Sequence, residues 1–235
     1  MNILTVEHLR KSYVRCQAVK GVSFAVPQGS IFGILGPNGS GKTTTLECIL
    51  GTKEMDEGTV RLLDRDPRRD RKMLFERVGV QFQDSSWQNS IRIGELCEST
   101  VVLYTPEPEW RGRLKALGFD PKQMADTLSG GEKQKLSILL ASLHNPEVLF
   151  LDELTTGLDP LSRRLVWDKI RELRDRGTTV ILTSHFMDEV EALCDSCLLL
   201  YKGKVLTRGT PEELKKEGGS ASLEDAYINL IGGAA

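Results

Sequence analysis

The sequence predicts an α/β fold in which a mixed sheet is accompanied by an N-terminal antiparallel β subdomain and an inserted helical subdomain. Three observations lead to this prediction. Apolar strands alternate with helical stretches through most of the 235 residues, as they do in α/β proteins. Residues 1–35 contain strand patterns alone. Between about 84 and 143, helical stretches dominate, and this change of pattern indicates the insert.

The elements before the insert follow from side-chain periodicity and from turn residues. Residues 3–6 and 19–26 alternate between apolar and polar side chains, as strands with one buried face do. A Pro-Gln-Gly-Ser turn leads into an apolar strand, and the helix after the following glycine-rich loop is stopped by Gly51. The prediction is strands at 3–6, 19–26, 31–35, 59–63 and 78–82, and helices at 42–50 and 66–76.

After the insert the alternation of strand and helix resumes. A flexible Gly-Gly-Ser segment precedes a short amphipathic helix near the end of the sequence. The prediction is strands at 148–151 and 178–183, helices at 160–176, 187–194 and 223–231, and a hairpin that turns at 202–204. Residues 1–235 are expected to form a single domain, with 84–143 as the helical insert and 218–235 as a C-terminal tail with a helix.

Composition indicates a soluble globular protein and gives no sign of a nucleic-acid partner. Apolar residues make up 40% of the chain, enough for a sizeable core, and the net charge is only −2. The basic stretch 61–72 also contains Asp64, Asp66 and Asp70, so it is interpreted as a solvated surface. No secretory signal or membrane-spanning run is visible, and a cytoplasmic chain is therefore expected.

Five scattered cysteines indicate a reducing compartment rather than a disulfide framework. Cys194 and Cys197 form a C-x-x-C pair, but a zinc ribbon would need a second pair at matching spacing. Cys197 also begins an apolar run. A buried strand position is therefore the preferred interpretation of this residue.

A glycine-rich motif joins the strand at 31–35 to the helix that starts at Lys42. It matches G-x-x-x-x-G-K-[ST], the phosphate loop of P-loop NTPases. Its glycines let backbone N–H groups converge on phosphate oxygens, Lys42 would neutralise the β- and γ-phosphates, and Thr43 would bind Mg²⁺. The alternative is a chance glycine-rich turn. The expected nucleotide-binding residues are Gly36, Pro37, Asn38, Gly39, Ser40, Gly41, Lys42, Thr43 and Thr44.

Two acids end the apolar strand that begins at Val148. Asp152 lies at the carboxyl end of this strand, where it would hold Mg²⁺ directly or through water. Glu153 follows and would polarise the attacking water. The alternative is that both acids merely cap the strand or the next turn.

Three single residues complete the expected site. Gln83 follows the strand at 78–82, where its amide could contact both the metal and the water. His185 ends the strand Val180-Ile181-Leu182-Thr183-Ser184 and could hydrogen-bond a γ-phosphate. Tyr13 could stack on adenine. Each has a plain alternative, respectively a surface glutamine, a structural histidine and a half-buried strand aromatic.

A second anion site is indicated by Leu128-Ser129-Gly130-Gly131-Glu132. A helix that begins with a hydroxyl and two residues without side chains presents free backbone N–H groups to an anion. Two anion sites far apart in one sequence suggest that two chains meet over one nucleotide.

Taken together and in this order, these motifs resemble the nucleotide-binding subunit of an ATP-binding cassette (ABC) transporter. The resemblance extends from about Leu4 to Leu230. It implies a Mg²⁺-dependent ATPase that binds ATP between the phosphate loop of one copy and the signature of a second, head-to-tail copy. Asp159, in Thr156-Gly157-Leu158-Asp159, would reach across the interface, and His185 would sense the γ-phosphate. The signature residues that would contact the partner's ATP are Ser129, Gly130, Gly131 and Glu132.

The resemblance also implies a partner and a location. A separate integral-membrane permease would be driven through the groove beside Gln83 and the insert, which places the chain on the inner face of the cell membrane. Trp87, Leu103 and Tyr104 are candidates for contact with this permease, although aromatic residues there could equally pack inside the insert. The alternative function is a soluble cassette ATPase acting on nucleic acid or ribosomes.

Within the family, the short insert and the ending at 209–214 resemble bacterial drug and antibiotic exporter subunits. Two positions depart from the usual family pattern. Leu154 stands where proline usually follows the catalytic acid, and Lys135 stands where arginine is usual late in the signature helix. These departures would affect the rate of hydrolysis rather than the reaction.

Overall fold

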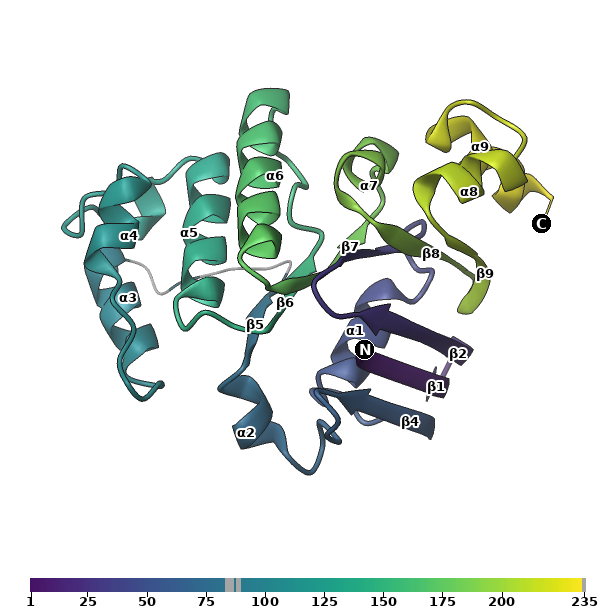
Figure 1. Ribbon diagram of the computed structural model, residues 1–235, viewed down its shortest axis with the longest axis horizontal. Helices are drawn as coiled ribbons and strands as arrows, with labels where there is room; N and C mark the ends of the chain where they lie inside the picture. Colours follow the sequence, from purple (N-terminus) through teal and green to yellow (C-terminus); the bar gives the residue numbers. More distant parts are fainter. Residues whose placement is uncertain (83–86, 88–89, 234–235) are drawn as a thin grey trace.

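A six-stranded mixed sheet forms the centre of the computed structural model, which describes residues 1–82, 87 and 90–233 (Figure 1). Its strand order is β5-β6-β7-β3-β8-β9. The first five of these strands are parallel to one another, and β9 pairs with β8 antiparallel. The strands are β3 (Ile31–Leu35), β5 (Val78–Gln81), β6 (Val148–Asp152), β7 (Thr179–Ser184), β8 (Ser196–Tyr201) and β9 (Lys204–Gly209).

Strand register brings the expected site to one edge of this sheet. Every residue of β3, β6 and β7 is buried, as in strands that are covered on both faces. Leu35 at the end of β3 is paired with Ser184, and Asp152 at the end of β6 is paired with Thr183. The carboxyl ends of β3, β6 and β7 therefore meet, and the loops that follow them lie together.

A separate three-stranded antiparallel sheet, in the order β2-β1-β4, confirms the predicted β subdomain. It consists of β1 (Asn2–Tyr13), β2 (Cys16–Pro27) and β4 (Glu57–Leu62). The strand predicted at 3–6 continues to Tyr13, because β1 pairs along its length with β2. Alternation is broken in the second half of β1 by register shifts between Val6 and Ser12, and so the pattern there did not predict a strand.

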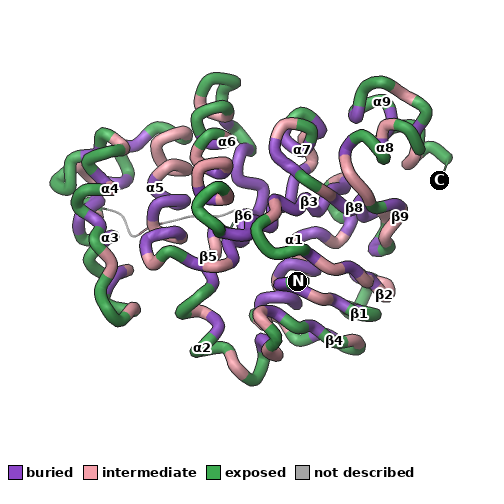
Figure 2. Tube along the Cα trace, viewed as in Figure 1, coloured by how far each residue is buried: buried purple, intermediate pink, exposed green. Residues whose placement is uncertain are grey.

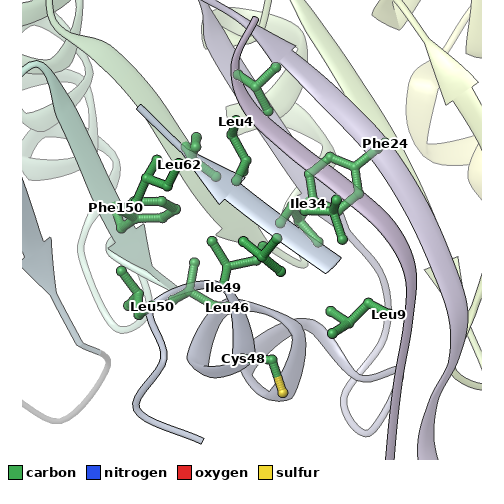
Figure 3. Packing of buried hydrophobic residues seen from close by; sticks show 14 of the residues in the cluster. Leu4, Leu9, Phe24, Ile34, Leu46, Cys48, Ile49, Leu50, Leu62 and Phe150 are labelled. Carbon is green, nitrogen blue, oxygen red and sulfur yellow. The ribbon is translucent and has the colours of Figure 1, made fainter. Parts of the chain in front are cut away.

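Helix α1 (Lys42–Ile49) lies between the two sheets, and its apolar side chains join both sheets in one core. Figure 3 shows Leu46 and Ile49 of this helix packed with Leu4 and Leu62 of the small sheet and Phe150 of the large one. A second core cluster covers the other face of the large sheet with α6 (Pro160–Asp175) and α7 (Met187–Leu193). The phosphate loop therefore joins two elements that are held firmly by packing.

The helical insert has a core of its own and projects from one end of the molecule (Figure 1). Its buried side chains include Ile93, Trp110, Leu114 and Leu136, whereas its outer face is exposed (Figure 2). Its elements are α3 (Ile93–Val101), α4 (Arg111–Ala116), a 3₁₀ turn (Ala125–Thr127) and α5 (Gly130–Ser142). The predicted helical insert is thus observed among the described residues.

Two helices differ from the prediction. The basic helix predicted at 66–76 is only α2 (Arg71–Phe75), because the Asp66 carboxylate accepts from Arg68 N and forms a turn there instead. Helix α8 (Pro211–Glu217) was not predicted. Its signal is present in the sequence, since Thr210 and Glu213 form a reciprocal capping box with proline in the first turn. It packs beside α9 (Leu223–Gly232), close to the predicted helix at 223–231.

Cys197 is fully buried in β8, as interpreted from the sequence, and both Cys194 and Cys197 are free thiols. Among the described residues, no helix is both long enough and apolar enough to cross a membrane.

Candidate functional site

The phosphate loop is pressed against neighbouring backbone at two of its glycines. Gly36 has a φ of 154°, and a Cβ added there would lie 2.3 Å from the carbonyl oxygen of Leu200. Gly41 has a φ of 105°, and its Cβ would lie 2.5 Å from the carbonyl oxygen of Ala18. No side chain fits at either position. The loop is therefore fixed between β2 and β8 before it enters α1.

Lys42 is held inside the loop rather than projecting into solvent. Its Nζ donates to the carbonyl oxygens of Gly36 (2.9 Å) and Pro37 (3.4 Å) and lies 3.2 Å from Glu153 Oε1. Both ionic side chains are buried, with 4% and 8% of their surfaces exposed. A hollow of about 270 Å³ opens here, lined by Asn38, Gly39, Gly41, Lys42, Thr43, Thr44 and Glu153.

The Thr43 hydroxyl and the Asp152 carboxylate lie close together next to this hollow. Thr43 Oγ1 lies 3.5 Å from Asp152 Oδ1, and the hydroxyl of Thr183 donates to the same carboxylate oxygen. Burial raises the pKa of Asp152, while the hydrogen bond from Thr183 opposes this shift. A hydroxyl and a carboxylate are hard ligands that suit Mg²⁺, an ion that usually binds few protein groups. The described residues contain no cluster of three or more His, Cys, Asp or Glu side chains that could hold a metal.

Glu153 occupies left-handed backbone, with a φ of 47°. Its N–H donates to the carbonyl oxygen of Thr183 (3.2 Å) and to Thr183 Oγ1 (3.0 Å), which holds this conformation. Leu154, the departure from the family pattern, packs its side chain into the core below α6. A proline there would push the preceding residue towards extended backbone. The leucine permits the conformation that aims Glu153 at Lys42.

His185 approaches the same carboxylate oxygen as Lys42. Its Nδ1 is 3.5 Å from Glu153 Oε1, and its ring packs against Phe186 with centroids 4.1 Å apart. The structure thus brings Lys42, Glu153 and His185, which are far apart in the sequence, to one place.

Ser129 begins α5 and forms a capping box with Glu132. Glu132 Oε2 accepts from Ser129 Oγ (2.6 Å) and from Ser129 N (2.9 Å), and these hydrogen bonds hold the pKa of Glu132 below its usual range. Ser129 and Gly130 are exposed, and neither they nor Gly131 line the hollow at the phosphate loop. Lys135, the other departure, is on the same helix and also lowers the pKa of Glu132. The two expected anion sites are separate within one chain.

Asp159 caps the neighbouring helix α6. Its carboxylate accepts from the N–H groups of Leu161 and Ser162, each at 3.0 Å, and from Ser162 Oγ at 2.5 Å. These bonds lower the pKa of Asp159. A Cβ added to Gly131 would lie 2.8 Å from Ser162 Oγ, so the beginnings of α5 and α6 are in contact. The signature and the Asp159 turn therefore form one continuous surface.

The remaining predicted residues lie at the edge of the site or outside it. Tyr13 ends β1 with 41% of its surface exposed, and the ammonium groups of Lys11 and Lys53 lie 5.8 and 5.6 Å from its ring centroid. This partial exposure fits both the predicted adenine contact and the alternative of a half-buried strand aromatic. Gln83 falls outside the described residues.

Of the three candidates for permease contact, one is exposed and two pack against other residues of the chain. Trp87 packs against the core of the insert, whereas Leu103 is largely exposed. Tyr104 stacks on His144, with ring centroids 4.1 Å apart.

Three residues that hold the site in place were not predicted from the sequence. They are Thr183, Thr155 and Glu189. Thr183 bonds both acids. Its only signal is a hydroxyl residue directly after the apolar run Val180-Ile181-Leu182. Glu189 is buried and accepts from Thr155 Oγ1 at 2.8 Å. It has no sequence signal, because a glutamate beside Asp188 in an amphipathic helix resembles a surface residue.

A larger hollow of about 550 Å³ lies elsewhere, between the insert and the end of α6. Its charged side chains are of both signs, among them Arg113, Glu147, Lys169 and Glu172. It includes neither the phosphate loop nor the acidic strand end. Size alone therefore does not mark the nucleotide site.

Comparison with known proteins agrees with this geometry. A sequence model of the family described as "ABC transporter" matches residues 19–156. The chain is 37% identical over 219 residues to "Nod factor export ATP-binding protein I" of Ralstonia nicotianae, covering 90% of this chain and 68% of that protein. It is 34% identical to "Probable multidrug ABC transporter ATP-binding protein YbhF" of Escherichia coli, covering 97% of this chain and 42% of that protein.

Solved structures give the same result. One described as "Structure of ATP binding subunit of ABC transporter" has a TM-score of 0.88 and 25% identity, covering 97% of this chain and 99% of that one. The cbiO1 structure from Clostridium perfringens, part of a cbiONQ transporter complex, has a TM-score of 0.79 and 28% identity, covering 97% and 98%. The chain belongs to the ABC transporter family and is an ATP-binding subunit of that family.

Proposed function

We propose that two copies of this chain, or one copy and a close homologue, clamp Mg-ATP head to tail and hydrolyse it to drive export by a separate membrane protein. One observation carries the proposal. Lys42, Glu153 and His185 meet over the phosphate loop, whereas the exposed start of α5 contributes nothing to that hollow. Each copy therefore supplies one half of a site, and the other half comes from its neighbour.

Nucleotide binding begins with the phosphate loop. The β- and γ-phosphate oxygens compete with Glu153 for the Lys42 ammonium, which lies 3.2 Å from that carboxylate. Backbone N–H groups of 36–43 and the start of α1 bind the remaining phosphate charge. Tyr13, at the exposed end of β1, stacks on adenine. Thr43, Asp152 and Gln83 would hold Mg²⁺, which supplies positive charge to the phosphates.

Hydrolysis requires a base beside the γ-phosphate. Water attacks the γ-phosphorus, Glu153 accepts a proton from that water, and the bond from phosphorus to the ADP oxygen breaks. His185 donates a hydrogen bond to the γ-phosphate from its place beside Glu153. Transfer of Lys42 from Glu153 to phosphate leaves the carboxylate available for the water.

The partner copy completes the site with the start of its α5. Ser129, Gly130 and Gly131 present a hydroxyl and N–H groups to the γ-phosphate, and the helix dipole favours the negative charge. Glu132 fixes Ser129 through the capping box, and Asp159 lies at the interface on the adjoining surface. ATP favours the closed dimer because only that state contacts the nucleotide from both sides, and hydrolysis removes the preference.

Export is proposed from the relatives. Two of them are named for Nod factor export and for multidrug transport. An integral-membrane permease would receive the motion at the insert, placing this chain on the cytoplasmic face of the membrane. The alternative of a soluble ATPase acting on nucleic acid or ribosomes is disfavoured by these names and by the net charge of −2.

The proposed role of Glu153 predicts a large loss of hydrolysis in Glu153→Gln. The amide keeps the shape of the side chain but cannot accept the proton, so phosphate release should fall at least about 100-fold. Binding of a fluorescent ATP analogue should be retained. Glu147→Gln is a matched control, because Glu147 pairs with Arg77 on the surface at the opposite end of β6. It should hydrolyse ATP like the parent.

Mg²⁺ dependence is tested with the same assay. Removal of divalent ions with EDTA should abolish hydrolysis by the parent, and added Mg²⁺ should restore it. Normal turnover by Glu153→Gln would remove Glu153 from its role. Normal turnover in EDTA would remove the metal from the scheme.

A further inference from the structure

A buried carboxylate that the mechanism above does not use lies directly under the site. Glu189 in α7 has only 2% of its surface exposed. Its Oε1 accepts from Thr155 Oγ1 at 2.8 Å and from Trp167 Nε1 at 3.2 Å. Burial raises the pKa of Glu189 and these hydrogen bonds oppose the shift. A carboxyl group is retained in such a place only when donors satisfy it.

Glu189 connects the segments that carry the two proposed active residues. Thr155 follows Glu153 by two positions and is itself fully buried. Glu189 itself lies in the first turn of α7, directly after the segment that carries His185. Trp167 belongs to α6, which packs against α7. One carboxylate therefore joins the turn after β6 to the turn after β7, and fixes both to the helix behind them.

A second set of contacts, closer to the surface, joins the segment after β7 to the start of α6. Arg163, in the first turn of α6, lies 2.7 Å from Asp188, and its guanidinium lies 4.5 Å from the Phe186 ring centroid. Phe186 in turn packs on His185. The segment 184–189 is thus attached to the start of α6 on its exposed side as well as on its buried side.

The conformation of Glu153 explains why such an attachment matters. A non-glycine residue in left-handed backbone is strained and persists only when its surroundings hold it. Thr183 holds the N–H of Glu153 on one side. On the other side, the first side chain anchored to the interior by a hydrogen bond is Thr155, and its acceptor is Glu189.

We propose that Glu189 is a positioning residue for ATP hydrolysis, holding the turn of Glu153 and the segment of His185 in one geometry through Thr155 and Trp167. The inference rests on the proposed roles of Glu153 and His185. Glu189 itself contacts neither nucleotide nor water. Its loss should therefore lower the rate of hydrolysis and leave ATP affinity nearly unchanged.

Thr155→Val is the most selective test. Valine keeps the shape of the buried side chain and removes only the hydroxyl that bonds Glu189. The kcat for ATP hydrolysis should fall about tenfold, equivalent to about 1.4 kcal/mol of barrier. The KM and the dissociation constant for ATP should stay within about twofold, because the phosphate loop is untouched.

Thr178→Val is the matched control. Thr178 is also buried, and its Oγ1 donates to the carbonyl oxygen of Pro146 at 3.0 Å, just before β7 and far from its catalytic end. This variant loses a comparable buried hydrogen bond, so it should lower the melting temperature by a similar amount. Its kcat should stay within about twofold of the parent.

A second pair of variants acts at Glu189. Glu189→Gln keeps an oxygen that can accept from both Thr155 and Trp167, so kcat should stay within about threefold of the parent. Glu189→Leu removes the acceptor and should lose at least as much activity as Thr155→Val. Should the leucine variant fail to fold, Thr155→Val combined with Glu189→Gln still decides the matter, since the two changes should be non-additive in kcat.

The outcomes separate this inference from the proposed function. If Thr155→Val and Glu189→Leu both hydrolyse ATP at the parental rate, and Glu153→Gln remains inactive, the positioning role is wrong and the proposed function stands. The positioning role is equally wrong if Thr155→Val loses no more activity than Thr178→Val. If Glu153→Gln itself turns over normally, the proposed function fails first.

Discussion

At the scale of single residues, the site depends on polar side chains whose charges are compensated by close neighbours. The backbone of Glu153 is in a strained, left-handed conformation, and Thr183 holds it by accepting the N–H of Glu153. The carboxylate of Glu153 is buried, and the ammonium group of Lys42 compensates its charge. Asp152 is held in the same way by Thr183. Nucleotide must enter this arrangement by replacing one of the existing contacts. The pair of Lys42 and Glu153 is the one that phosphate chemistry can replace, because phosphate competes with carboxylate for an ammonium group.

His144 provides a prediction about pH at the same scale. It stacks on Tyr104, and burial lowers its pKa to about 4, from an ordinary value of 6.5. The unfolded chain therefore binds this proton more readily, and stability that is present above pH 6.5 is lost as the pH falls towards 4. The shift corresponds to at most about 3 kcal/mol, and to about 1–2 kcal/mol after screening by solvent at this partly buried site.

The check is urea unfolding of the parent and of His144→Phe at pH 7.5 and pH 5. Phenylalanine keeps an aromatic ring against Tyr104 and cannot titrate. The parent should lose stability relative to the variant on acidification. Equal losses in both proteins would show that His144 is not buried in its neutral form.

The sequence predicted the residues of the site better than the residues that hold them in place. Lys42, Glu153 and His185 were predicted because each lies in a motif or directly after a strand, and parallel strands bring such positions together. Thr183, Thr155 and Glu189 were missed because their roles depend on pairing between β6 and β7 and on the packing of α7. Those contacts join segments about thirty residues apart, and no local pattern reports them.

At the scale of elements, the start of α5 is where local folding and proposed function meet. Its first turn contains two glycines with different surroundings. A Cβ at Gly130 would approach only Leu158, at 3.9 Å, whereas a Cβ at Gly131 would meet Ser162 at 2.8 Å. The second glycine lets α5 approach α6 closely, and the first leaves space on the exposed side for the proposed partner nucleotide.

This difference predicts opposite effects of two alanine substitutions on folding without nucleotide. Gly130→Ala should leave stability unchanged or raise it by up to about 1 kcal/mol, because alanine favours helix. Gly131→Ala should cost about 1–2 kcal/mol, because the added Cβ would lie 2.8 Å from Ser162 Oγ and either Ser162 or the two helices must shift. Chemical unfolding of the two variants and the parent measures both. Equal stability of the two variants would contradict the close contact between the helices.

The elements that the sequence predicted are those with long periodic patterns or with clear turn residues at their ends. The strands at 31–35 and 148–151 are found within one residue of their predicted ends. β1 was predicted too short because its bulges interrupt the alternation, and α8 was missed although Thr210-Pro211-Glu212-Glu213 is a strong helix start. β1 is longer than its local pattern because pairing with β2 extends it. The start of α8, in contrast, has a capping signal in the local sequence.

At the scale of the whole molecule, the described residues form three hydrophobic clusters, two on the faces of the large sheet and one within the insert. Most of the insert packs around its own cluster, whereas Ile138 of α5 packs in a cluster of the large sheet. The phosphate loop belongs to the sheets, and the start of α5 belongs to the insert. A nucleotide held between these parts of two copies would link their positions, and this provides a route from hydrolysis to a membrane partner.

Dimerisation of Glu153→Gln in saturating Mg-ATP, followed by light scattering, tests the central claim most directly. With hydrolysis blocked, ATP should hold two copies together, and the measured mass should double from that of the 26.1 kDa monomer. Adding Ser129→Arg, which places a bulky side chain at the start of α5, should return the protein to a monomer that still binds ATP. A Glu153→Gln protein that stays monomeric, or a double variant that dimerises equally well, would contradict the shared site.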